Sequence, residues 1–176
     1  MNRKSISPDQ LVTHPFGAWD KGWYLLSAGD FAAKQFNSMT VSWGFFGTIW
    51  GKPMAITVVR PQRHTFQFID KADSYTLCAF GDEHRRVLNV LGTKSGRNMD
   101  KINASGFTPV AASVVASPAY AEAELVIECR KAHFQDIDPR NFLADYIADC
   151  YKNDYHRMYF GEVVAASATD RYLAAD

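Results

Sequence analysis

Polar and apolar residues alternate from Asn37 to Gly51, and this period of two predicts a β-strand. One face of the strand is apolar and carries Met39, Val41, Trp43 and Phe45. The opposite face is small or hydroxylic and carries Ser38, Thr40, Ser42 and Gly44. Hydroxyls and a glycine make a flat surface that a planar heterocycle can approach closely. The pattern therefore fits a strand that holds a planar ligand, and it equally fits a half-buried strand with a polar outer face.

Five further strands are predicted over residues 22–28, 54–59, 75–80, 124–130 and 155–166. Residues 54–59 are apolar on both faces, which predicts a buried strand. In residues 124–130 the apolar positions alternate with Glu124, Glu128 and Arg130, so one face is expected in the core and the other in solvent. Residues 109–118 are weakly patterned and fit either a loop or a strand.

Short helices are predicted between these strands. One follows Pro61 and places Phe66 and Ile69 on its core side. A second begins near Asp82 and stops at Gly92, with an apolar stripe made by Val87, Leu88 and Leu91. A third opens at Ser95 or Asn98 and ends near Gly106. A fourth follows Asp138 and Pro139, with apolar residues at helical spacing at Phe142, Leu143, Tyr146, Ile147 and Cys150.

Six or seven strands with short inserted helices favour a mainly β fold, a β-barrel with short helices, over a doubly wound α/β sheet. The 176 residues, 47% of them hydrophobic and 22% charged, predict one domain over residues 1–176 with a substantial core. Nineteen basic and nineteen acidic side chains give a net charge of zero, which argues against a nucleic-acid or electrostatic membrane surface.

Cysteine usage and the N-terminal sequence predict a cytoplasmic protein. Cys78, Cys129 and Cys150 are widely spaced and odd in number, which argues against a disulfide scaffold or a zinc knuckle and favours a reducing compartment. The N-terminal residues have no apolar signal region, and no apolar run is long enough for a spanning helix.

Two basic groups are candidates for binding an anion. Arg60 and Arg63 flank Pro61, and Thr65 would lie in the first turn of the following helix. The second group joins the cations of Lys94, Arg97 and Lys101 to the Ser95 hydroxyl and the Gly96 amide. Both groups suit a phosphate. The alternative is that they are solvated surface charges paired with Asp70, Asp100 or Glu83.

Other common sites are absent from the sequence. The spacing of a phosphate-binding P-loop is missing around Lys94, and no dinucleotide-binding glycine fingerprint occurs. The five histidines are scattered, so no metal site is predicted. Among them, His156 follows an acidic and aromatic stretch at the start of a strand and could reach a ligand, although a core or surface histidine fits the pattern as well.

Four segments together resemble one family: NSMTVSWG, GKPMAITVVRPQRHT, GTKSGRNMDK and YHRMYFGE, in this order. They resemble the flavin reductase-like, flavoredoxin-type FMN-binding split-barrel proteins, over residues 19–164 of this chain. The resemblance implies a six-stranded split-barrel homodimer that binds FMN without a covalent bond, near the subunit interface. The chain departs from the commoner family pattern at His64, Asn98 and Ile102.

The resemblance also assigns roles to residues. Those expected at the isoalloxazine ring and ribityl chain are Asn37, Ser38, Met39 and Thr40, with Trp43 lining the pocket. Those expected at the phosphate are Arg60, Arg63 and Thr65, and then Ser95, Gly96, Arg97 and Lys101. His156 would approach the flavin or the nicotinamide side of the pocket. No residue is nominated as a catalytic acid or base, because the cofactor carries the redox chemistry.

The implied activity is hydride transfer from NADH or NADPH to flavin. An alternative within the same family is an FMN electron carrier that takes electrons from a redox protein partner and has no NAD(P)H activity of its own. A third reading is an oxidase or binding protein that uses the barrel for another flavin, haem or pyridoxal ligand.

Overall fold

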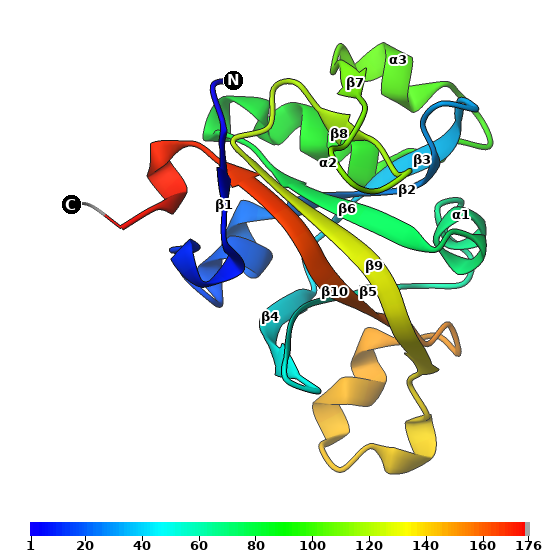
Figure 1. The fold of residues 1–176 in the computed structure, drawn as a ribbon. Coiled ribbons are helices and arrows are strands. Elements are labelled where there is room, and N and C mark those ends of the chain that lie inside the picture. The colour runs from blue at the N-terminus through cyan, green and yellow to red at the C-terminus, as the bar shows by residue number, and fades with distance from the viewer. Residues whose placement is uncertain (175–176) are drawn as a thin grey trace.

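A computed structural model describes residues 1–174 and places most of the strand residues in one antiparallel sheet (Figure 1). The strand order is β3-β2-β6-β9-β10-β5-β4, and β1 pairs with β10 beside this path. The strands are β1 (Lys4–Ile6), β2 (Tyr24–Asp30), β3 (Gln35–Val41), β4 (Gly44–Ile49), β5 (Lys52–Val59), β6 (Ser74–Ala79), β9 (Leu125–Asp136) and β10 (Arg157–Ala168). A separate two-stranded sheet pairs β7 (Pro109–Val110) with β8 (Ala119–Tyr120).

The helices are short. The α-helices are α1 (Phe66–Lys71), α2 (Arg85–Thr93) and α3 (Lys101–Ser105). Short helices of other types are η1 (Pro8–Gln10), η2 (Ala18–Gly22), η3 (Asp82–His84), η4 (Pro139–Asn141), η5 (Asp145–Cys150) and η6 (Asp170–Tyr172). None of the helices in residues 1–174 has the length and apolar character needed to cross a membrane. The prediction of a mainly β fold with short helices is confirmed.

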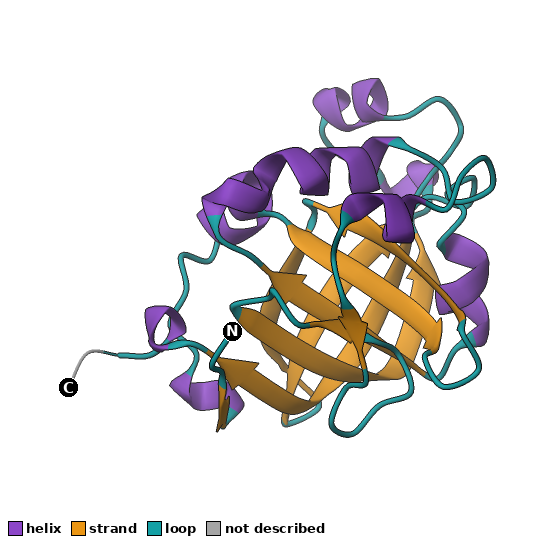
Figure 2. Cartoon of the chain, turned by 90° about the horizontal axis from the view of Figure 1, so that it is seen from above, coloured by secondary structure: helices purple, strands orange, loops and turns teal. Residues whose placement is uncertain are grey.

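The sheet closes into a split barrel because its two edge strands are neighbours in the chain. β3 and β4 stand at opposite ends of the strand order, yet only Ser42 and Trp43 separate them. The three peptide units from Val41 to Gly44 can span no more than about 11 Å. The sheet must therefore curl until its edges meet at this connection, which we call the seam. Figure 2 shows the strands wrapped into this barrel with helices around the outside.

The seam corrects the prediction of one strand over residues 37–51. That stretch forms two strands with different partners, because β3 pairs with β2 and β4 pairs with β5. Alternation continues through the break, which is why the sequence pattern does not show it. The expected polar outer face is also wrong for β3, since Ser38 is as fully buried as its apolar neighbours.

Two hydrophobic cores lie on the two faces of the sheet. Leu26, Leu77 and Ile127 point into the barrel interior, while the next or preceding residues, Leu25, Cys78 and Val126, pack outward. Leu88 and Leu91 of α2 cover this outer layer, as their helical spacing predicts. Because α2 lies over β3, its C-terminal end is brought to the seam.

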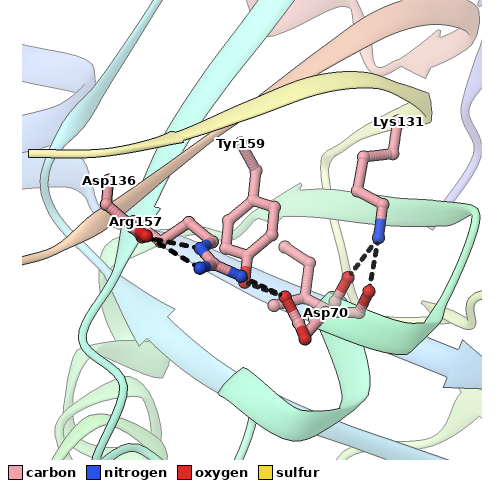
Figure 3. A network of polar contacts seen from close by, with 6 residues as sticks. Asp70, Lys131, Asp136, Arg157 and Tyr159 are labelled. Carbon is pink, nitrogen blue, oxygen red and sulfur yellow. Dashed lines mark hydrogen bonds and ion pairs between the residues drawn. The ribbon is translucent and has the colours of Figure 1, made fainter.

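A polar network fixes α1 to the barrel (Figure 3). Arg157 of β10 donates to the Asp136 carboxylate of β9 at 2.7 Å and to Asp70 of α1 at 2.6 Å. Lys131 of β9 donates at 2.8 Å to the carbonyl oxygens of Ile69 and Asp70, at the C-terminal end of the same helix. The network therefore holds α1, and with it the basic segment that precedes the helix, in a fixed position on β9 and β10.

Two further expectations are wrong. Residues 138–150 form the short 3-10 helices η4 and η5 in place of one continuous helix. Leu143 and Tyr146 are 99% and 73% exposed, because this segment has no core to pack against. Glu128 was expected in solvent but is buried. Its carboxylate accepts backbone N–H groups from Ser113, Val114 and Val115, which provide in the interior the hydrogen bonds that water would otherwise supply.

Candidate functional site

A cavity of about 290 Å³ opens at the seam, and we call it the seam cavity. Residues 39–43, from the end of β3 and the connection to β4, form one wall. Val58 and Arg60, at the end of β5, form the opposite wall. Arg63, Gly92 and His156 complete the lining. Because β3 and β5 are not hydrogen-bonded to each other, the cavity occupies the space where the sheet has no strand pair.

One end of the seam cavity is cationic. The Arg63 guanidinium is half-buried and donates a hydrogen bond to the carbonyl oxygen of Gly92. Burial lowers the pKa of Arg63, and the neighbouring Arg60 lowers it further. Arg60 is bound by the segment between β9 and β10: it donates to the Asp154 carboxylate and, at 2.8 Å, to the Cys150 carbonyl oxygen. Both guanidinium groups thus line the cavity, and the guanidinium of Arg60 also lies 5.2 Å from the centroid of the Tyr151 ring.

The seam cavity also has an aromatic wall. The ring centroids of Trp43 and His156 lie 5.0 Å apart, and Trp43 remains 43% exposed. His156 is buried, and its Nδ1 atom lies 3.0 Å from the Tyr151 hydroxyl. Burial, and after it the charge of Arg60, lowers the pKa of His156 to about 4. The imidazole is therefore neutral at pH 7 and can exchange a hydrogen bond with a ligand without adding charge.

A second cavity, of about 570 Å³, lies beside α3, and we call it the outer cavity. Its apolar lining is formed by Phe31, Phe36, Phe68, Met99, Ile102, Phe107 and Pro109. Asn37, His64, Gly96 and Lys101 supply polar groups to the same cavity. Gly96 packs closely here, since a Cβ atom at this position would lie 2.8 Å from Asn37 Oδ1 and from His64 Cδ2.

Lys101 has a structural role beside the outer cavity. Its side chain is buried, and its Nζ atom donates to the carbonyl oxygens of Leu91 at 2.7 Å and Lys94 at 3.2 Å. Lys101 and Arg63 thus both satisfy carbonyl groups at the C-terminal end of α2. Burial, and after it the charge of Arg63, lowers the pKa of Lys101 to about 8.

The predicted site residues divide between the two cavities. The seam cavity receives Met39, Thr40, Trp43, Arg60, Arg63 and His156. The outer cavity receives Asn37, Gly96 and Lys101. The Ser95 hydroxyl accepts the Arg97 backbone N–H at 3.2 Å, and the Arg97 side chain donates to the Gln62 carbonyl oxygen at 2.9 Å. Both residues lie in the chain between Gly92 and Lys101, and neither lines either cavity.

Three predicted site residues are buried or packed for other reasons. The Ser38 hydroxyl lies 2.7 Å from the hydroxyls of both Ser27 and Tyr120, inside the protein. The Thr65 hydroxyl accepts a hydrogen bond from the Asn37 amide at 2.7 Å. Gly44 is small because a Cβ atom there would lie 2.4 Å from the Trp19 ring. Gly44 therefore makes room for the indole of Trp19, and this packing alone explains why the residue is a glycine.

Sequence reasoning did not assign Val58 or Gly92, which line the seam cavity, to a ligand site. It also missed Tyr151 and Asp154, which contact the lining residues His156 and Arg60 and directly follow the segment that was predicted as a helix. The acidic and aromatic residues just before His156 were the signal that could have placed this segment at a ligand site.

The arrangement suits an anion attached to a planar group. Arg63 and Lys101 make no ion pair with any carboxylate in residues 1–174. Their charges also repel each other, as the lowered pKa of Lys101 shows. An anion placed between them would relieve this repulsion. The aromatic wall of the seam cavity lies beside Arg60, and a planar group could pack there.

The family model for the flavin reductase like domain matches residues 16–174 of the chain. A comparison with curated protein sequences finds no match. Among solved structures, the fold is similar to flavoredoxin of Desulfovibrio vulgaris (Miyazaki F), with a TM-score of 0.67 and 20% identity over 93% of this chain and 78% of that chain.

Two other solved structures have the same fold. One is the FMN-binding domain of a flavin reductases-like enzyme from Shewanella baltica OS155, with a TM-score of 0.66 and 15% identity over 95% of this chain and 77% of that chain. The other is the NADH:FAD oxidoreductase SgcE6 of Streptomyces globisporus C-1027, with a TM-score of 0.65 and 13% identity over 86% of this chain and 77% of that chain. At these identities the likeness establishes the fold, and the predicted split barrel is confirmed.

Proposed function

The chain belongs to the flavin reductase-like domain family, and on this premise we propose that it binds FMN in the seam cavity and transfers hydride from NADH or NADPH to flavin. The observation that carries the proposal is a pair of cations, Arg63 and Lys101, that have no carboxylate partner within residues 1–174 and lie beside an aromatic-walled cavity. A phosphate is the anion that this donor set suits, because a guanidinium and an ammonium both bind phosphate oxygens strongly.

The residues of the seam cavity would bind and orient the flavin, and a bound flavin would supply the capacity to accept and return a hydride. Arg63 and Arg60 hold the phosphate end, and Trp43 limits where the ring can lie. The neutral His156 is fixed by Tyr151 and offers one hydrogen bond at the edge of the ring site. No residue acts as an obligatory acid or base in this proposal.

The homodimer implied by the family remains part of the proposal. Trp43, Phe45 and Trp50 lie on the seam and on the β4–β5 hairpin and are 43%, 46% and 65% exposed. A second subunit seated on these rings would cover the open side of the seam cavity. Sedimentation at several protein concentrations tests this: we expect a dimer, and Trp50→Glu should shift the protein toward the monomer.

Flavin binding is tested by titrating FMN and following the quenching of its fluorescence. Arg63→Met should weaken binding by at least about tenfold, because a charge-assisted hydrogen bond is worth roughly 1.5–3 kcal/mol. Arg60→Ala should weaken it as well. Arg140→Met is the matched control, since Arg140 is exposed, pairs with Asp138 and does not line the cavity. Equal FMN affinity in Arg63→Met and the control would remove the proposed phosphate site.

The second candidate function is an FMN electron carrier without NAD(P)H activity, which the similarity to a flavoredoxin favours. Anaerobic mixing of the FMN-loaded protein with NADH, and then with NADPH, separates the two functions. Rapid loss of the oxidised flavin band near ~450 nm would support the reductase. A stable band that dithionite removes would support the carrier.

A further inference from the structure

A further cavity, of about 490 Å³, lies between the segments that contain η2 and η6, and we call it the η6 cavity. Its lining comes from residues 12–24, residues 79–82 and the turn η6. The backbone N–H of Val12 donates to the Tyr172 carbonyl oxygen at 2.9 Å and joins the first of these segments to the last (Figure 1). The η6 cavity shares no lining residue with the seam cavity or the outer cavity. It is therefore a separate site, of a size usual for small-molecule pockets.

The Tyr24 hydroxyl at the η6 cavity lacks a hydrogen-bond partner. Tyr24 is only 1% exposed, and its Oη atom is buried with no partner among residues 1–174. Thr13 and Tyr172 are polar neighbours of this hydroxyl and line the same cavity, yet neither meets the distance and angle limits of a hydrogen bond to it. An unpaired buried hydroxyl costs free energy, which a bound acceptor oxygen would recover. Burial raises the pKa of Tyr24, so the hydroxyl stays protonated and can donate.

The next lining residue, Trp23, has a strained backbone. Its φ and ψ are 64° and 152°, a combination that residues other than glycine rarely adopt. Two contacts fix the indole: its Nε1 atom donates to the Asp20 carbonyl oxygen at 3.1 Å, and the Arg85 guanidinium lies 3.1 Å from the ring centroid. Such strain persists only where surrounding contacts maintain it, and it is concentrated at functional sites. The protein thus holds an indole rigidly in the wall of this cavity.

The shape of the ligand follows from the aromatic part of the lining. Planar groups bind well against aromatic rings, by stacking or by edge-to-face packing. The rings that line the η6 cavity are those of Trp23, Tyr24, Phe80 and Tyr172. A ligand of one or two fused rings could therefore pack here while its oxygen reaches the Tyr24 hydroxyl.

The charges around the η6 cavity favour a neutral ligand over an anion. Its one guanidinium, that of Arg171, already donates to the Glu124 carboxylate at 2.8 Å. The Asp82 carboxylate adds negative charge to the same lining. His14 also lines the cavity, but it is exposed to solvent, where charge is screened. No lining cation is thus left without a carboxylate to balance it, in contrast to Arg63 at the seam cavity.

We propose that the η6 cavity binds a neutral, planar aromatic molecule of one or two rings, through a carbonyl oxygen that accepts a hydrogen bond from Tyr24. The rings of this ligand pack against Trp23 and Phe80. The site is separate from the proposed flavin site, so the inference goes beyond the proposed function and does not rest on it.

Calorimetry with coumarin tests the site, because coumarin is neutral, planar and bicyclic and carries a carbonyl oxygen. Tyr24→Phe removes only the hydroxyl and should weaken coumarin binding roughly fivefold, as the loss of one neutral hydrogen bond does. Tyr75→Phe is the matched control, since Tyr75 is also fully buried and donates to the Ala55 carbonyl oxygen but does not line the cavity. The control should bind coumarin as the wild type does.

Urea unfolding of the ligand-free proteins separates a ligand-binding hydroxyl from a structural one. Tyr24→Phe should not lower the unfolding midpoint, because the hydroxyl has no partner to lose. Tyr75→Phe should lower the midpoint, because it removes a hydrogen bond that the folded protein makes. A lower midpoint in Tyr24→Phe would show that its hydroxyl is already paired, and the proposal would be overturned.

Two further titrations test charge and location. Coumarin-3-carboxylate should bind at least about tenfold more weakly than coumarin, because its charge would face Asp82 and Glu124. Saturating FMN should leave coumarin affinity unchanged. The proposal is overturned if coumarin does not bind, if Tyr24→Phe binds it as the wild type does, if the carboxylate binds more tightly, or if FMN displaces coumarin. Failure of the protein to bind FMN would overturn the proposed function alone, and the comparison of Tyr24→Phe with Tyr75→Phe would still decide the η6 cavity.

Discussion

The Nζ atom of Lys101 lies 2.7 Å from the carbonyl oxygen of Leu91, so a buried lysine from α3 closes the C-terminal end of α2. Lys131 does the same for α1, where it donates to Ile69 and Asp70. Both helices are too short to be stable alone; α1 follows one basic segment of the candidate site, and α2 ends at the other. Lysines contributed by other elements thus hold these ends in place.

Lys101 should make stability depend on alkaline pH. Its pKa is about 8 in the folded protein and 10.5 in its ordinary range. Between these values the unfolded chain binds a proton that the folded protein has lost, so stability rises with pH, by at most about 1.4 kcal/mol per pH unit. Denaturant unfolding from pH 7 to 11 measures this. The rise in stability should be smaller in Lys101→Met. It should be unchanged in Lys94→Met, because the Lys94 side chain is exposed. Parallel curves of stability against pH for the wild type and both variants would contradict the prediction.

Substitution by alanine should change the free energy of unfolding much more at Gly44 than at Gly47 of β4. At Gly44 a Cβ atom would lie 2.4 Å from the Ile56 carbonyl oxygen and from the Trp19 ring, whereas at Gly47 nothing lies within 4 Å. Gly44→Ala should therefore lower the free energy of unfolding by about 1–3 kcal/mol through overpacking. Gly47→Ala should change it by less than about 0.5 kcal/mol, as an exposed site does. Urea unfolding of both variants tests the pair, and similar losses in both would rule out the packing explanation.

The Glu128 carboxylate should be more important to stability than an exposed carboxylate with a similar role. It accepts hydrogen bonds from Ser113, Val114 and Val115, while Glu122 accepts one backbone N–H, that of Thr108, at the surface. Glu128→Gln places an amide N–H₂ against backbone donors, and we expect a loss of about 1–3 kcal/mol. Glu122→Gln should cost less than about 0.5 kcal/mol. Thermal unfolding compares them, and hydrogen exchange should show residues 113–115 opening in Glu128→Gln alone.

His156 should make the protein less stable in acid. Its pKa falls from 6.5 to about 4 on folding, because the ring is buried and lies near Arg60. Below pH 6.5 the unfolded chain takes up a proton that the folded protein does not, so stability falls as the pH drops from 6.5 to 4, by roughly 1–3 kcal/mol. His156→Gln keeps a hydrogen-bonding group for Tyr151 and should remove most of this fall. Unfolding of the ligand-free protein across that pH range is the measurement.

Much of the barrel could be predicted from local pattern, and the exceptions have physical causes. Strand alternation and the stripe of α2 follow from periodicity, which reports the face that each element buries. The break at Ser42 could not be seen, because Trp43 and Phe45 continue the alternation across the seam. The burial of Glu128 depends on backbone N–H groups of a loop that is folded over β9, and no pattern within the strand reports them.

For the candidate site, too, local sequence pattern predicts some features, while others depend on tertiary contacts. The basic motifs contain four residues that line the two cavities, namely Arg60, Arg63, Gly96 and Lys101. What the motifs could not show is that Arg63 and Lys101 also cap α2, or that Ser38 lies among buried hydroxyls. Such roles depend on which carbonyls and hydroxyls the fold brings near each side chain.

The seam has a mechanical consequence. At most positions of a closed barrel, widening the wall means breaking ladder hydrogen bonds, but β3 and β4 are held together here by two covalently linked residues. Rotation about the backbone of Ser42 and Trp43 can move one edge relative to the other while every strand pair in the sheet stays intact. The width of the seam cavity can therefore adjust to a planar guest through backbone torsion, without loss of a strand pair.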